Sequence, residues 1–202
     1  MVEQKNKYHH GDLKEQLVEA VRQLIEEHGP DGFSIAQACR LAGVSTAAPY
    51  KHFKDRDDIL LNVVKSAMMR MGTAMQGAAD AHPPGAPERV IELGKAYVDF
   101  ARREPGIFAL MFGLAGDHAD QDELTCMGRA TYGIVTGVVS EHLGLPPDHP
   151  DVDARAYALW CAVHGHAFLM LDGKADRTKI QVSEDAYLAL VGGALLPQRV
   201  DA

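Results

Sequence analysis

The sequence predicts an all-α protein of about nine helices in two domains. Almost every long segment repeats its apolar residues at the helical period, and no segment shows the alternation of a β-strand. Hydrophobic residues make up 47% of the 202 residues, which suits a sizeable core and not a disordered chain. Because Asp55 opens a long helical segment, we predict one domain over residues 1–54 and a second over residues 55–202.

Composition excludes several classes of protein. No run of about 18 apolar residues is present to span a membrane, and the first residues lack the apolar stretch of a secretory signal. Cys39, Cys126 and Cys161 are scattered and show no CxxC spacing. This favours a reducing, cytoplasmic location over a disulfide framework or zinc cluster. We expect no cofactor and no bound metal.

The charge is unevenly distributed. The net charge is −8, yet residues 1–54 hold seven Lys or Arg and seven Asp or Glu, so the acidic excess lies in residues 55–202. An acidic second domain would limit unwanted contact with phosphates. The balance therefore permits DNA binding by the first domain without itself indicating it.

The first predicted helix has one apolar face and clear end signals. Asp12 and Glu15 suggest a capping box, and Gly29-Pro30 ends the helix. Before it, a basic arm is either a solvated terminus or a phosphate contact. The residues of the apolar face are Leu13, Leu17, Ala20, Val21, Leu24 and Ile25, and those of the arm are Lys5, Lys7, Tyr8, His9 and His10.

Two short helices are predicted next, joined by a turn at Gly43. Ser34 caps the first with Gln37, and Ser45 caps the second, which runs from Thr46 to Lys51. So short a helix must be fixed by packing, and Pro49 should make it short or bent. Ile35, Ala38 and Leu41 are expected to face inward. Thr46, Ala47, Tyr50 and Lys51 are expected to face outward, where small side chains approach bases and long ones reach phosphates.

These residues resemble the DNA-binding signature of the TetR family of transcriptional regulators. The resemblance lies in Gly32, Ser34, Ile35, Ala42-Gly43-Val44-Ser45, Tyr50, His52-Phe53 and Asp55-Arg56-Asp57. It implies that the third helix enters the major groove and that Ser34, Tyr50, Lys51 and His52 contact phosphates. The predicted DNA-binding residues are Ser34, Ser45, Thr46, Ala47, Tyr50, Lys51, His52 and Lys54.

The second domain is predicted to hold a ligand pocket and a dimer interface. Residues 152–172 are apolar nearly all round, which indicates a helix enclosed on both sides. The last helix is capped at Ser183, and its interior glycines suggest close approach by another helix. The predicted interface residues are Leu159, Val163, Met170, Ala189, Gly192 and Gly193.

A second resemblance concerns Trp160, His164-Gly165, Leu169 and Leu171-Asp172-Gly173, together with the opening YHHGDL. They are similar to a TetR subgroup with a Trp-His-Gly motif. The methionine stripe that follows Asp55 is either core or a deformable pocket wall, and His164 is either a ligand contact or a satisfied core histidine. The predicted pocket residues are Met68, Met71, Met75, Phe108, Met111, Phe112, Trp160, His164 and Phe168.

We therefore expect a homodimeric, ligand-responsive DNA-binding regulator, a repressor that a small apolar molecule releases from a palindromic operator. One alternative is a DNA-binding regulator that senses no small molecule. Another is an enzyme in the second domain, although no HExxH pair, Ser/His/Asp ordering or glycine-rich phosphate loop supports it. A metal site could be drawn from Asp117, His118, Asp120 and Asp122, but nothing fixes them together, and a solvated loop explains them better.

Overall fold

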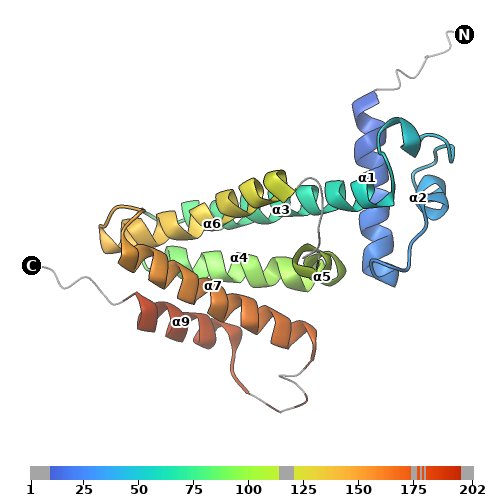
Figure 1. Ribbon diagram of the computed structural model, residues 1–202. Helices are drawn as coiled ribbons and strands as arrows, with labels where there is room; N and C mark the ends of the chain where they lie inside the picture. Colours follow the sequence, from blue (N-terminus) through green and yellow to red (C-terminus); the bar gives the residue numbers. More distant parts are fainter. Residues whose placement is uncertain (1–9, 114–120, 174–176, 178, 180, 197–202) are drawn as a thin grey trace, which may run out of the picture. The chain divides into compact units, whose positions relative to one another are not determined.

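The computed structural model describes residues 10–113, 121–173 and 181–196, together with Arg177 and Lys179. Within these residues the chain is all helical, as predicted, with eight α-helices, one 3₁₀ helix and no strand (Figure 1). No helix in the described ranges is long and apolar enough to cross a membrane. The elements are α1 (His10–His28), α2 (Ile35–Leu41), η1 (Pro49–Lys51), α3 (Arg56–Asp80), α4 (Glu88–Arg103), α5 (Pro105–Gly113), α6 (Gln121–Leu143), α7 (Pro150–Leu171) and α9 (Glu184–Leu195).

The chain forms two compact units that are not simple halves of the sequence. The first unit comprises residues 1–67 and 106–115, and the second comprises residues 68–105 and 116–202. Helix α3 therefore contributes residues to both units, and α5 belongs with the first. The boundary expected between residues 54 and 55 falls just before α3, inside the first unit, which continues to residue 67.

Local capping signals set most helix ends of the first unit. The Ser34 hydroxyl accepts the backbone N–H of Gln37 at 3.2 Å, and the Gln37 side chain accepts the Ser34 N–H at 2.8 Å, which confirms the predicted capping box. Asp55 accepts the N–H of Asp58 at 2.8 Å and caps α3. The prediction that Asp12 caps α1 is wrong, because the helix begins two residues earlier, at His10.

Two glycines of this unit allow shapes that other residues would hinder. Gly29 ends α1 with a φ of +78°, a conformation that favours glycine. At Gly32 a Cβ atom would lie 2.2 Å from the His28 carbonyl oxygen, so only glycine lets the chain return so close to the end of α1. A larger residue at position 32 would clash with the end of α1.

The segment expected to be the third α-helix is a turn followed by a single 3₁₀ turn. Pro49 begins η1 and has no N–H, and the Ser45 carbonyl instead accepts the N–H of Ala48 at 3.0 Å. The Pro49 carbonyl then accepts the N–H groups of His52 and Phe53, both at 2.9 Å. Ser45 therefore caps no α-helix, which corrects the sequence interpretation, whereas the expected shortening at Pro49 is confirmed.

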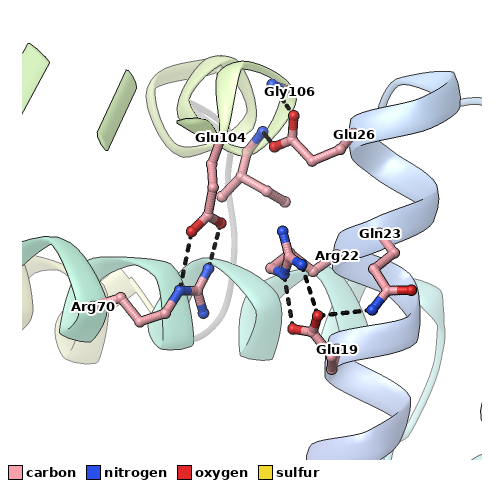
Figure 2. A network of polar contacts seen from close by, with 8 residues as sticks. Glu19, Arg22, Gln23, Glu26, Arg70, Glu104 and Gly106 are labelled. Atoms are coloured by element: carbon pink, nitrogen blue, oxygen red, sulfur yellow. Dashed lines mark hydrogen bonds and ion pairs between the residues drawn. The ribbon is translucent and has the colours of Figure 1, made fainter. Parts of the chain in front are cut away.

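Helix α5 is held to α1 by a side chain and by a close backbone contact. The Glu26 carboxylate accepts the N–H groups of Gly106 at 3.0 Å and Ile107 at 2.8 Å (Figure 2). Because Pro105 has no N–H, these are the first donors at the start of α5. A Cβ atom at Gly106 would lie 2.9 Å from the Ile25 carbonyl oxygen, so glycine permits this approach.

In the second unit, α4 packs against α6, α7 and α9 (Figure 1). The close approach inferred from interior glycines occurs inside the subunit. A Cβ atom at Gly94 would lie 3.1 Å from Leu188, and Gly192 faces Ile91. Ser183 caps α9 as predicted by accepting the N–H of Ala186 at 3.2 Å. Arg70 and Glu104 form a 2.6 Å ion pair within this unit (Figure 2).

Candidate functional site

An exposed turn carries most of the predicted DNA-binding residues. Tyr50 is 65% exposed, and His52 is half-buried while the other predicted residues are exposed. The Ser34 hydroxyl is exposed but engaged in the capping box with Gln37. Polar and small side chains are thus gathered within residues 45–54. The exposed members of the predicted set are Ser34, Ser45, Thr46, Ala47, Tyr50, Lys51 and Lys54.

Buried residues anchor this turn from beneath. Pro49 and Phe53 are almost fully buried, and the Lys14 ammonium lies 5.6 Å from the centre of the Phe53 ring. Leu41, which was expected to face inward, is instead 52% exposed. Because packing fixes the turn, Tyr50 and Lys51 are presented on a defined backbone even without an α-helix.

Arg56 fixes the segment that joins α1 to α2. Its guanidinium donates a hydrogen bond to the Pro30 carbonyl oxygen and lies 4.6 Å from the centre of the Phe33 ring. Phe33 is buried, so the cation covers an aromatic face and satisfies a backbone acceptor at once.

The second unit contains an apolar cavity of about 40 Å³ that is partly open. The residues around it come from α3, α4, α6 and α7, and none of them carries a charge. Tyr97 and Trp160 supply the polar side-chain atoms among them. The lining residues are Met75, Val90, Leu93, Gly94, Tyr97, Val135, Val138, Val139, Leu159, Trp160 and Val163.

Beside the cavity, the buried Tyr97 and the half-buried His164 form a polar pair. The Tyr97 hydroxyl lies 2.7 Å from Nδ1 of His164. Burial raises the pKa of Tyr97 far above its ordinary range, and a hydrogen bond from Trp160 offsets part of that rise. Burial lowers the pKa of His164, so its ring is neutral at pH 7. The three side chains form an uncharged hydrogen-bonding group.

The predicted pocket residues do not all meet at this cavity. Met75 and Trp160 line it, and His164 contacts it through Tyr97. Met71 is buried, Met68 faces Gly128 of α6, and Phe168 is 39% exposed with its ring packed on His164. Phe108, Met111 and Phe112 lie on α5 in the first unit and are not part of the cavity wall.

Most of the cavity wall was not singled out as a site by sequence reasoning. Val90, Leu93 and Tyr97 of α4 and the three valines of α6 are absent from the predicted pocket residues. Gly94 was the clearest signal in the sequence that the prediction did not use. A glycine inside a helix costs about 1 kcal/mol of stability relative to alanine. Here the absence of a side chain leaves room for Leu188.

Nothing in the described ranges gathers three or more His, Cys, Asp or Glu residues that could hold a metal ion. The loop site drawn from Asp117, His118 and Asp120 lies outside the described residues, as does the side chain of Asp122. Of the predicted basic arm, Lys5, Lys7, Tyr8 and His9 also lie outside them, whereas His10 is the first residue of α1.

Two family models match the chain. Residues 17–63 match the model for bacterial regulatory proteins of the tetR family, and residues 90–192, about half of the chain, match the tetracyclin repressor-like C-terminal domain. The chain belongs to the TetR family. The first match ends within α3 and the second begins in α4, so the two models cover the exposed turn and most of the cavity wall respectively.

The curated proteins that the chain resembles include two mycobacterial regulators. The chain is 26% identical over 130 residues to the HTH-type transcriptional regulators Rv1816 of Mycobacterium tuberculosis and Mb1846 of Mycobacterium bovis. The match covers 63% of this chain and 53% of each relative, so the chain spans about half of their length.

Solved structures extend the similarity to the whole fold. A protein of unknown function from Rhodococcus sp. RHA1 is 30% identical, has a TM-score of 0.79, and is covered over 97% of its length by 95% of this chain. FadR from Bacillus subtilis, solved in complex with stearoyl-CoA, is 15% identical with a TM-score of 0.67, over 91% of this chain and 97% of that one. At that identity the FadR likeness concerns the fold alone.

The TetR-family second unit leaves apolar side chains exposed on α7 and α9. On α7 they lie at helical spacing, and on α9 Leu190 is 71% exposed beside Ala186, Ala189, Gly193 and Ala194. We call these residues the α7–α9 face. Its α7 members are Tyr157, Trp160, Cys161, Gly165, Phe168 and Leu169.

The predicted interface residues fall on both sides of these helices. Ala189 and Gly193 belong to the α7–α9 face, and Met170 is half-buried. Leu159 and Val163 are buried against the cavity, and Gly192 packs on α4. These three are occupied inside the subunit and are not free to contact a partner, which corrects their assignment.

Proposed function

We propose that this TetR-family chain is a homodimeric repressor that binds a palindromic DNA operator through residues 45–54. The observation that carries the proposal is the exposed pair Tyr50 and Lys51, presented on a turn that buried Pro49 and Phe53 anchor. Small side chains before the pair leave room for base edges, and Lys51 supplies a phosphate contact.

Dimerisation follows from how little one turn can recognise. A single short segment touches few base pairs, whereas two copies on a two-fold axis recognise half-sites about 34–36 Å apart. The α7–α9 face supplies an apolar surface for the partner, since exposed apolar stripes on two adjacent helices favour association. We place the two-fold axis there.

A small molecule in the cavity of the second unit would regulate DNA binding. A solidly filled unit would favour a regulator without effector, and the cavity beside Tyr97 supports the ligand-responsive alternative. Helix α3 supplies Met75 to the cavity wall and begins directly after the proposed DNA-binding turn. A ligand releases the operator only to the extent that it binds the released state more tightly than the DNA-bound state.

The test is selection of bound sequences from a random DNA pool, with and without small molecules extracted from cells. We expect enrichment of a palindrome that Tyr50→Ala abolishes, and loss of that enrichment when the extract is present. A Tyr187→Phe variant, changed far along the sequence in α9, serves as the control. No enriched sequence, or equal enrichment by Tyr50→Ala, would overturn the proposal of DNA binding, and indifference to all extracts would overturn that of ligand response.

A further inference from the structure

The cavity lacks any group that could neutralise a charged ligand. None of its lining residues is Lys, Arg, His, Asp or Glu, and nine of the eleven have no polar side-chain atom. Burying an ion without a partner is far more costly than burying a hydroxyl or carbonyl that finds a hydrogen bond. The wall therefore selects against carboxylates, phosphates and ammonium groups.

The hydroxyl of Tyr97 is a hydrogen-bonding group in the apolar wall. Its oxygen receives the hydrogen bond from Trp160 and is paired with Nδ1 of His164. A phenol hydroxyl can both donate and accept hydrogen bonds. Because burial keeps both Tyr97 and His164 uncharged at neutral pH, this group favours a polar but uncharged head group over an ion.

The cavity must widen to take a whole molecule. One water needs about 10–15 Å³ of such space, and the cavity has about 40 Å³. Met75 is flexible and can change its rotamer. It is the movable part of a wall that is otherwise made of short, branched or ring side chains.

We infer that the effector is an uncharged molecule with an apolar body and a single hydroxyl or carbonyl group, which hydrogen-bonds to the hydroxyl of Tyr97. His164 is then a positioning residue that holds the Tyr97 hydroxyl. The inference rests on the proposed role of the cavity as the effector site. The inferred effector differs in charge from stearoyl-CoA, the phosphate-bearing ligand in the structure of FadR from Bacillus subtilis.

Trp160 supplies the readout, because it is the one tryptophan of the chain and lines the cavity. The full-length protein is titrated with 1-hexanol, hexanoate and hexylammonium at pH 7.5 while Trp160 emission is recorded. These probes share a six-carbon body and differ in the charge of the head group. We expect a saturable change with hexanol, and at least tenfold weaker binding of both ions.

A pair of matched variants tests the contact with Tyr97. Loss of one hydrogen bond should weaken hexanol binding by roughly 3- to 10-fold in Tyr97→Phe. Tyr187→Phe also loses a part-buried hydroxyl, one that donates to the Ala162 carbonyl oxygen at 2.8 Å, but Tyr187 does not line the cavity. Hexanol binding by Tyr187→Phe should match that of the unchanged protein.

Three results would overturn the inference: no saturable response to hexanol, hexanoate or hexylammonium binding as tightly as hexanol, or equal weakening in Tyr97→Phe and Tyr187→Phe. Operator binding by the unchanged protein without any probe is measured in parallel by fluorescence anisotropy of labelled DNA. Normal operator binding together with any of the three results refutes the ligand class alone. Absence of operator binding refutes the proposed function instead.

Discussion

The carboxylate of Glu26 caps α5 by accepting the backbone N–H of Gly106 at 3.0 Å, with Ile107 bound in the same way (Figure 2). A residue of α1 thereby satisfies the start of a helix about eighty residues further along the chain. We expect Glu26→Ala to destabilise the protein by about 1–3 kcal/mol, because two part-buried donors lose a charged acceptor. Urea unfolding followed by circular dichroism measures the effect.

The matched control for that substitution is Glu27→Ala. Glu27 is the next residue of α1, is exposed, and pairs with the exposed His28 at 3.6 Å. Its loss should change the free energy of unfolding by less than about 0.5 kcal/mol. Equal effects of the two substitutions would contradict the capping role of Glu26.

Lys51 should contribute to DNA binding in a sequence-independent way. Lys51→Gln is expected to weaken binding to operator and non-operator DNA alike, and to reduce the slope of log affinity against log salt by about one. Fluorescence anisotropy at several salt concentrations gives that slope. Lys179→Gln, which removes an exposed cation of the second unit, should leave it unchanged. An unaltered slope in Lys51→Gln excludes the predicted phosphate contact.

The α7–α9 face should hold two subunits together. A glutamate at the centre of an apolar interface would be buried without a partner, so Leu190→Glu is expected to yield monomers and to lower operator affinity by tenfold or more. Light scattering coupled to size-exclusion chromatography measures the mass. Met69→Glu is the control, because Met69 is 60% exposed on α3 and lies outside the face. A dimeric Leu190→Glu protein would place the interface elsewhere.

His164 should make stability depend on pH. Burial lowers the pKa of His164 in the folded protein, while the unfolded chain titrates near 6.5. Below that pH the unfolded state binds a proton that the folded state resists, so the contribution of His164 to stability falls as the pH falls. The melting temperature of the unchanged protein minus that of His164→Gln should be smaller at pH 5.5 than at pH 7.5. A constant difference would show that His164 does not titrate in this range.

Local signals allowed much of the fold to be predicted. Ser34, Asp55 and Ser183 cap their helices because each bonds to a backbone N–H three residues away. Such contacts involve only neighbours in sequence, so the pattern of residue types is sufficient to find them. Gly29 ended α1 for the same kind of reason, since a positive φ is a property of the residue itself.

The pattern of residue types could not predict contacts between residues that are distant in sequence. Both faces of α7 are apolar, and periodicity does not say which of them meets the cavity and which is left exposed. Leu159 and Val163 were therefore assigned to a partner subunit, although they line the cavity. The hydrogen bonds from α5 to Glu26 left no local signal in the sequence. A glutamate on the polar side of an amphipathic helix fits the same sequence pattern whether or not a distant residue bonds to it.

The placement of α5 also limits how the protein can be dissected. A fragment that stops at residue 67 would end inside α3 and omit Ile107, Phe108 and Leu110, which are buried side chains of α5 in the first unit. Such a fragment would leave the carboxylate of Glu26 without the donors that it bonds in the intact chain. A hybrid regulator built by joining residues 1–67 of this chain to the second unit of another TetR-family protein must therefore carry α5 with it, or supply a helix that begins with Pro-Gly at the same place.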